Sequence, residues 1–99
     1  MVRPAKEILD TLSEHRDTIR AYGVRRLGLF GSHARDAAGS ASDLDFVVDF
    51  ETKSFDGYMD LKFFLEELFS SKVDLVLEST IKPRLRDAIL GEALYAPGL

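Results

Sequence analysis

The stretch of residues 27–50 (LGLFGSHARDAAGSASDLDFVVDF) constrains the fold more than any other part of the chain. A short apolar run ends at Gly31 and Ser32, and after a polar loop a second apolar run carries Asp43 and Asp45. Small residues let a phosphate approach the backbone, and residues two apart on a strand point to the same face. The stretch therefore predicts two strands joined by a phosphate-binding turn, with paired carboxylates suited to a divalent metal ion.

Length and composition limit the architecture and the classes of function. The chain has 99 residues, of which 45% are hydrophobic and 30% charged, and it contains no cysteine. These values are typical of a single folded domain over residues 1–99. The lack of cysteine excludes a disulfide framework, a cysteine-based zinc site and a cysteine nucleophile. The formal net charge of −4 argues against direct binding of nucleic acid, which rests on Lys and Arg that neutralise phosphates.

The N-terminal residues do not resemble a targeting segment. Arg3, Lys6, Glu7 and Asp10 are charged where a signal peptide requires an unbroken apolar stretch. Later apolar runs are also too short to span a membrane. We therefore expect a cytoplasmic protein without a membrane partner.

Hydrophobic periodicity predicts alternating helices and strands. Helices are expected at residues 4–21, 32–38, 55–70 and 82–90, and strands at residues 24–30, 43–50 and 72–77, with a further short strand near Leu94. Ser32 and Ser54 are the expected helix caps, and Gly23 and Gly91 the expected helix ends. This order predicts a small α/β (α+β) domain with a sheet whose helices pack mainly on one face.

Two further residues extend the candidate site. Asp74 is the acidic residue within the apolar run of the third strand, where we expect it to supply a third carboxylate, the alternative being an exposed position at the strand end. Arg35 lies one turn after Gly31 and Ser32 and can reach the same phosphates, or it can form a salt bridge with a nearby carboxylate. His33 is either a phosphate contact or a histidine on a helix surface.

The spacing of these residues resembles a known signature. Gly31 and Ser32, followed by ten residues and then Asp43-Leu44-Asp45, resemble the GS-x10-D-x-D motif of the polymerase β-type nucleotidyltransferase superfamily. The resemblance is closest to the minimal nucleotidyltransferases (MNT) and covers about residues 24–95. It implies a small mixed sheet. One departure is that members often continue with Arg-Gly where this chain has Arg35-Asp36.

The resemblance also implies roles for the candidate residues. Gly31 and Ser32 would bind the nucleotide phosphates. Asp43 and Asp45 would hold two Mg²⁺ ions. Asp74 would be the third metal-binding carboxylate and the residue on the side of the general base.

Minimal members commonly serve as the antitoxin of HEPN/MNT toxin–antitoxin pairs, the MntA-like antitoxins. They transfer AMP from ATP to a tyrosine of the HEPN ribonuclease toxin, so the implied partners are a nucleoside triphosphate and a HEPN-type toxin. Two alternatives remain open at this point. The chain can be a non-catalytic antitoxin that blocks the toxin by stoichiometric binding, or a nucleotidyltransferase for a small-molecule acceptor.

Overall fold

The computed structural model describes residues 4–35, 43–52 and 54–99. In chain order its elements are α1 (Ala5–Glu14), α2 (Arg16–Ala21), β1 (Val24–Phe30), β2 (Leu44–Phe50), α3 (Phe55–Phe69), β3 (Val73–Leu77), the 3₁₀ turn η1 (Glu78–Thr80), α4 (Pro83–Glu92) and β4 (Leu94–Tyr95). The predicted strands, including the short strand near Leu94, are confirmed.

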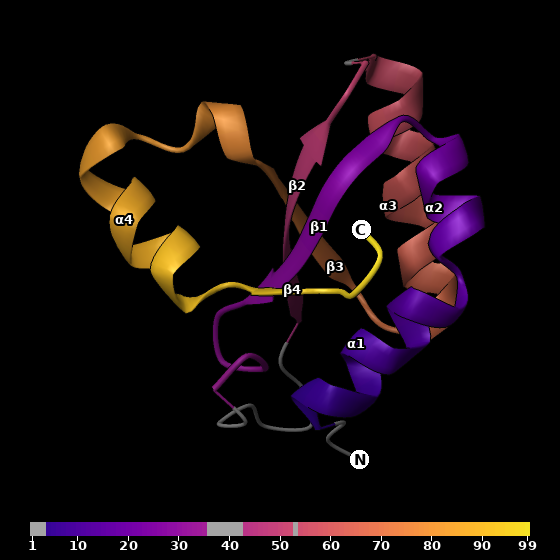
Figure 1. Ribbon diagram of the computed structural model, residues 1–99, viewed down its shortest axis with the longest axis horizontal. Helices are drawn as coiled ribbons and strands as arrows, with labels where there is room; N and C mark the ends of the chain where they lie inside the picture. The colour runs from indigo at the N-terminus through magenta and orange to yellow at the C-terminus, as the bar shows by residue number, and fades with distance from the viewer. Residues whose placement is uncertain (1–3, 36–42, 53) are drawn as a thin grey trace.

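The four strands form one mixed sheet in the order β3-β2-β1-β4. β2 and β3 run parallel, whereas β1 is antiparallel to both β2 and β4. Helices α1, α2 and α3 cover one face of the sheet, and α4 stands apart on the other side (Figure 1). The predicted fold class, a small mixed sheet with helices mainly on one face, is confirmed.

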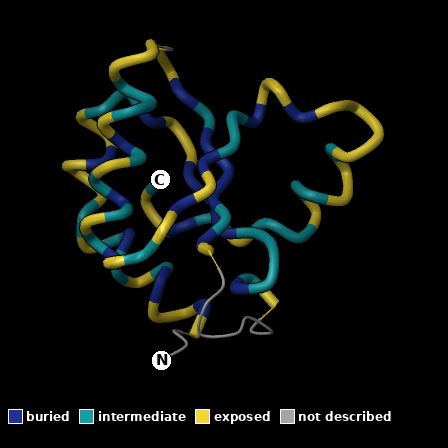
Figure 2. The backbone as a smooth tube through the Cα atoms, turned by 180° about the vertical axis from the view of Figure 1, so that it is seen from behind, coloured by how far each residue is buried: buried dark blue, intermediate teal, exposed yellow. Residues whose placement is uncertain are grey.

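Alternation along β2 separates the core from the face that carries charge. Leu44, Phe46, Val48 and Phe50 are buried against the helices, whereas Asp45 and Asp49 lie on the opposite face and are half-buried. The helices supply the other side of this core with Ile8, Leu12, Ile19, Leu61, Leu65 and Phe69. Buried residues accordingly concentrate in the sheet and on the inner sides of α1 to α3 (Figure 2). In the part of the chain that the structure describes, no helix has the length and apolar character needed to cross a membrane.

Two predicted helices differ from the structure. The helix expected over residues 4–21 is broken at His15, because the His15 ring Nδ1 lies 2.9 Å from the Thr11 carbonyl oxygen and the ring packs on Phe64 with centroids 5.9 Å apart. The helix expected over residues 32–38 is also wrong in its first half, since residues 31–35 are turns. A helix this short has too few hydrogen bonds to offset its nucleation. Residues 36–38, like the turn predicted at 39–42, lie outside the described residues.

The last helix is longer than predicted. α4 continues through Gly91 to Glu92 and none of its residues is buried. Ala93 N–H donates to the Ile89 carbonyl oxygen at 3.0 Å, so Gly91 lies inside the helix and does not end it. The extension places the Glu92 carboxylate in the last turn.

A buried carboxylate connects this loosely packed helix to the sheet. The Glu78 side chain is 8% exposed, and its Oε1 accepts from Arg26 at 2.7 Å and from Arg86, on α4, at 3.3 Å. The Arg26 guanidinium in turn lies over the Tyr95 ring, 5.3 Å from its centroid. Tyr95 packs closely on Gly28, where an added Cβ would lie 3.1 Å from the ring. β1, η1, α4 and β4 therefore meet around one carboxylate.

We expect Glu78→Gln to lower the free energy of unfolding by about 1–3 kcal/mol, because hydrogen bonds between charged groups at a buried site are lost. Urea unfolding followed by circular dichroism measures this change. Asp10→Asn is the matched control, since it removes a carboxylate whose pairing with Lys6 is exposed. Equal effects of the two substitutions would contradict a structural role for Glu78.

Candidate active site

The Gly31 turn lies directly against Asp45. Phe30, the last residue of β1, pairs with Asp45 in the antiparallel β1–β2 register. Gly31 then turns the chain with a φ of +76°, and a Cβ built on it would collide with the Asp45 carboxylate. A glycine is required here both by the left-handed backbone and by this contact. The predicted phosphate turn and the predicted metal ligand are therefore neighbours.

Asp74 lies beside Asp45 on the next strand. The two residues are register partners in the parallel β2–β3 pair. Asp43 immediately precedes β2 and is exposed, as is Asp74. Burial raises the pKa of the Asp45 carboxyl most, and the negative charge of Asp74 raises it further. His33 opposes the rise in this pKa, Asp43 adds to it less than Asp74 does, and Arg35 opposes it least. The three predicted carboxylates thus act on one another electrostatically around Asp45.

This arrangement fits a divalent cation without being a closed site. Among the described residues no group of three His, Asp or Glu side chains lies close enough to enclose a metal ion. Carboxylates held side by side repel one another, so they separate unless a cation lies between them. Carboxylate oxygens are the ligands that Mg²⁺ prefers, and Mg²⁺ is usually held by one or two protein carboxylates together with substrate phosphates. Asp45 and Asp74 meet that requirement, and the ligand set with Asp43 stays a prediction.

The two hydrogen-bond donors expected to bind phosphate, the Gly31 N–H and the Arg35 guanidinium, are both bonded to the carboxylate of Glu92. The Gly31 N–H donates to Glu92 Oε1 at 2.7 Å, and Arg35 Nη1 lies 2.8 Å from Glu92 Oε2. Arg35 therefore forms the salt bridge that was the alternative to phosphate binding. Ser32 is half-buried in the same turn. Its contact with phosphate stays a prediction.

Glu92 was not among the residues singled out from the sequence. The expected end of the last helix at residue 90 placed it in a loop. In the structure Glu92 lies in the last turn of α4, where a carboxylate is opposed by the helix dipole and so calls for a compensating partner. Here that partner is a backbone N–H and a guanidinium.

His33 lies within the site region and not on a surface. Its side chain is buried, with 6% of the residue exposed, and the ring Nδ1 has no hydrogen-bond partner. It belongs to the same turn as Gly31, and it is among the groups that oppose the rise in the pKa of Asp45. The interpretation as a histidine on a helix surface is wrong.

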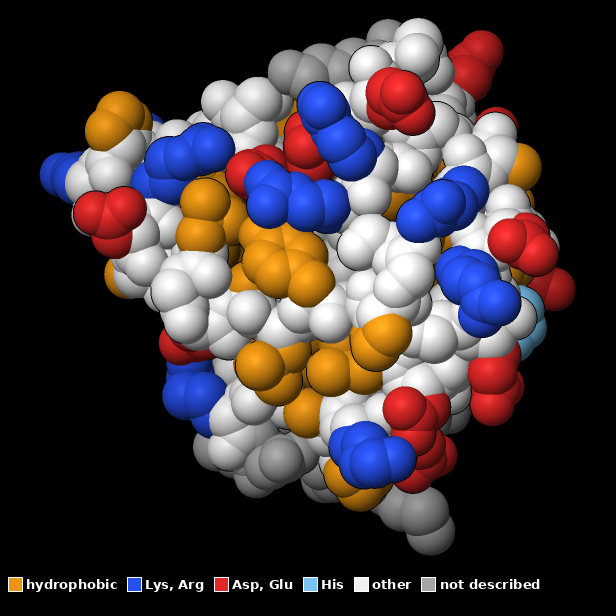
Figure 3. Space-filling model, viewed as in Figure 1, with side chains coloured by type: hydrophobic (Ala, Val, Ile, Leu, Met, Phe, Trp, Pro, Cys, Tyr) orange, Lys and Arg blue, Asp and Glu red, His pale blue; other side chains and the backbone are white. Residues whose placement is uncertain are grey.

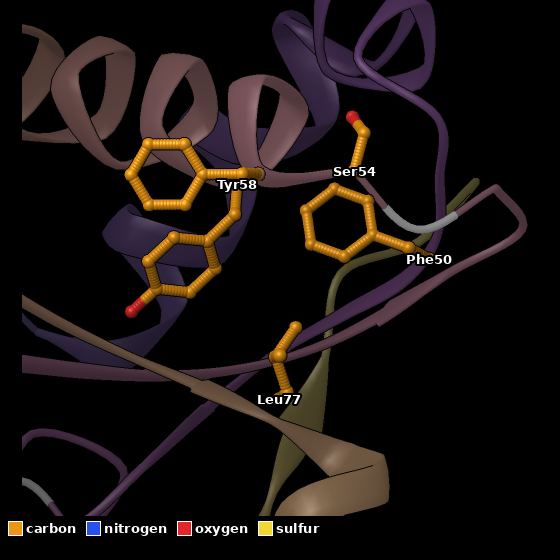
Figure 4. Close-up of a pocket in the computed structure, with 5 residues that line it drawn as sticks. Phe50, Ser54, Tyr58 and Leu77 are labelled. Carbon is orange, nitrogen blue, oxygen red and sulfur yellow. The ribbon is translucent and has the colours of Figure 1, made fainter.

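An apolar pocket lies at the other end of the strands. It has a volume of about 440 Å³ and is lined by Phe50, Ser54, Phe55, Tyr58 and Leu77 (Figure 4). Phe50 ends β2 five residues after Asp45, a separation of roughly 16 Å along a strand. The pocket is therefore remote from the carboxylates.

Comparison with known families gives the match that decides the classification. Residues 6–96 match the nucleotidyltransferase domain family, which is nearly the whole chain. The chain belongs to the nucleotidyltransferase domain family. The matched range includes the Gly31 turn, Asp45 and Asp74.

Individual relatives agree with this classification. This chain is 38% identical over 92 residues to the protein adenylyltransferase MntA of Thermococcus cleftensis, and the alignment covers 91% of this chain and 93% of the relative. It superposes with a TM-score of 0.72 on a solved structure provisionally described as a minimal nucleotidyltransferase, at 38% identity, covering 87% of this chain and 93% of the other. A chain of the solved complex between a tri-AMPylated Shewanella oneidensis HEPN toxin and an MNT antitoxin shares the fold, with a TM-score of 0.63 at 19% identity over 92% of this chain and 73% of that one.

The surface of this nucleotidyltransferase domain carries charges of both signs. On the face seen in Figure 3, Lys and Arg side chains lie among Asp and Glu side chains around a central apolar patch. Charges of opposite sign are also paired in the salt bridges Arg25–Asp49 and Arg26–Glu78. This face therefore does not present the uniform positive charge that a nucleic-acid-binding surface requires.

Proposed function

We propose that the chain is a Mg²⁺-dependent protein adenylyltransferase that acts as an antitoxin by transferring AMP from ATP to a tyrosine hydroxyl of a HEPN-type toxin. The observation that carries the proposal is the contact of the Gly31 turn with Asp45, which itself pairs with Asp74. A phosphate-binding turn and two neighbouring carboxylates are what phosphoryl-type transfer needs, since its catalysis is mostly positioning and charge neutralisation.

The nature of the acceptor is supported by the relatives. The Thermococcus cleftensis relative is named a protein adenylyltransferase, and this chain covers 93% of it. The structurally similar MNT antitoxin is bound to a tri-AMPylated HEPN toxin. A protein acceptor also fits the geometry, because Asp74 is exposed on β3, which is one of the two edge strands of the sheet.

In the proposed reaction the chain's residues mainly hold and orient the nucleotide. The Gly31 N–H and the Arg35 guanidinium would donate to phosphate oxygens. Asp45 and Asp74, with Asp43, would hold Mg²⁺. When bound, Mg²⁺ lowers the charge on the phosphates and orients the attacking and leaving oxygens.

The bond changes of the transfer balance without a further reactant. The tyrosine oxygen forms a bond to the α-phosphorus of ATP, and the bond from that phosphorus to the oxygen bridging the β-phosphate breaks. Pyrophosphate leaves with the bonding electron pair. The hydroxyl proton passes to Asp74, whose exposed position lets an acceptor on another chain approach it.

The proposal is tested by incubating the protein with α-labelled ATP, Mg²⁺ and a purified candidate HEPN-type toxin. We expect label on a tyrosine of the toxin and loss of toxicity. The Asp43→Asn/Asp45→Asn double variant should transfer no label and should leave the toxin active. If that variant still suppresses toxicity, and wild type labels nothing, the chain is a stoichiometric binder and the enzymatic proposal is overturned.

A further inference from the structure

The Glu92 carboxylate lies where a nucleotide phosphate is expected. One of its oxygens accepts from the Gly31 backbone N–H and the other pairs with the Arg35 guanidinium, at 2.7 and 2.8 Å. A backbone N–H beside a guanidinium is the donor pair that binds two oxygens of a phosphate. The carboxylate thus makes the contacts that the proposed function assigns to the triphosphate.

We propose that Glu92 is an internal competitor for the phosphate position, which closes the site when no nucleotide is bound and is displaced when ATP enters. This inference rests on the proposed nucleotide site at Gly31 and Arg35. Both anions cannot use the same two donors at once. A carboxylate left beside a triphosphate would also repel it, so binding of ATP requires Glu92 to leave.

The surroundings of Glu92 allow that movement. The side chains of Arg35 and Glu92 are 56% and 31% exposed, so their salt bridge is screened by water and weak. α4 buries none of its residues and stands away from the body of the fold (Figure 1). At its first turns it is held by Arg86, which pairs with Glu78. The last turn is therefore the part of α4 that can move at small cost.

Displacement of Glu92 would couple nucleotide binding to the end of α4. The Ala93 N–H bonds to the Ile89 carbonyl oxygen, and Leu94 follows immediately as the partner of Leu29 in β4. With Glu92 released, the last turn loses its link to the Gly31 loop while β4 stays paired. The conformation of residues 89–93 would thus report whether the site holds a nucleotide.

The test measures ATP affinity by isothermal titration calorimetry in the presence of Mg²⁺ for wild type, Glu92→Gln and Asp87→Asn. If the competing carboxylate lowers the fraction of binding-competent protein, its removal tightens apparent binding in proportion, and we expect about 3- to 10-fold for Glu92→Gln. Asp87→Asn removes an exposed carboxylate from the same helix and controls for net charge. It should change the affinity much less.

A second measurement distinguishes a Glu92 that competes with phosphate from a Glu92 that merely holds the Gly31 loop in place. Amide hydrogen exchange at residues 89–93 should become faster when ATP is added to wild type, and should already be fast in nucleotide-free Glu92→Gln. Glu92→Asp, which keeps the charge but has a shorter reach, should fall between the two. Unchanged or weaker ATP binding by Glu92→Gln, with wild type binding normally, would overturn the inference. Absence of ATP binding in every variant would instead overturn the proposed function.

Discussion

Replacing Asp45 with asparagine is expected to reduce adenylyl transfer by about 10³-fold or more, while the nucleotide-free protein becomes more stable than wild type. Asp45 lies between the Gly31 turn and Asp74, and in the proposed reaction its carboxylate holds the Mg²⁺ that neutralises the phosphates, so asparagine would remove that electrostatic stabilisation. Transfer of α-label from ATP to the toxin measures the first effect. Thermal unfolding followed by circular dichroism measures the second.

The gain in stability follows from the direction of the pKa shift. Burial and the neighbouring carboxylates raise the pKa of Asp45 above its ordinary value of 3.8. A raised carboxyl pKa means that the folded state favours the protonated form of Asp45. The free energy of unfolding of the wild-type protein therefore decreases as the pH rises from the unfolded-state pKa of Asp45 through its folded-state pKa. The melting temperature of Asp45→Asn should therefore equal that of wild type in acid and exceed it at neutral pH. Added Mg²⁺ should raise the melting temperature of wild type more than that of the variant.

Asp49→Asn is the control for both effects. Asp49 lies on the same face of β2 but at its far end, where it pairs with Arg25 at 3.0 Å. Its replacement should leave the rate of transfer nearly unchanged and should not raise the melting temperature. An Asp45→Asn protein that transfers AMP at the wild-type rate would exclude Asp45 from the active site.

The second large effect is expected from Gly31→Ala. The backbone at Gly31 has a φ of +76°, which costs a residue with a side chain about 1–3 kcal/mol. The new Cβ would also displace the Asp45 carboxylate. Because a displacement of about 1 Å in a catalytic group can cost 10²-fold in rate, we expect transfer to fall by about 10²-fold or more. We expect the melting temperature to fall as well.

Gly91→Ala provides a matched control for the backbone effect. Gly91 lies inside α4, and an added Cβ meets nothing within 4 Å. Alanine in a helix interior should stabilise the protein by about 0.5–1 kcal/mol. Opposite signs in denaturant unfolding for the two glycine variants are expected. Stabilisation by Gly31→Ala would show that the turn does not have the conformation described.

Much of the fold and part of the site were predictable from local patterns. The alternation of Leu44, Asp45 and Phe46 defined both the strand and the face that carries charge. The predicted adjacency of the Gly-Ser turn and the carboxylates follows from the same strands, since the turn ends one and Asp45 begins the next. Asp74 could be placed beside Asp45 because it is the acidic residue in an apolar strand.

The remaining features depend on contacts between distant residues. The break at His15 comes from packing on Phe64, which periodicity within the helix does not report. Glu92 reaches Gly31 across 61 positions of the chain, so no window of sequence contains both residues. The burial of His33 likewise arises from elements that fold over it. Tertiary contacts, and not local propensity, determine these three features.

The distance along the chain between Gly31 and Glu92 also sets the order of assembly. β1 pairs with β2 early in the sequence, whereas β4 pairs with β1 through Leu94 and Tyr95 only after the whole of α4 has been made. Contacts between distant residues form late because their loop closure is entropically costly. During synthesis on the ribosome the Gly31 loop must therefore remain without its glutamate partner until Glu92 has emerged. The competing carboxylate therefore reaches the Gly31 turn only after the strands that carry Asp45 and Asp74 have been made.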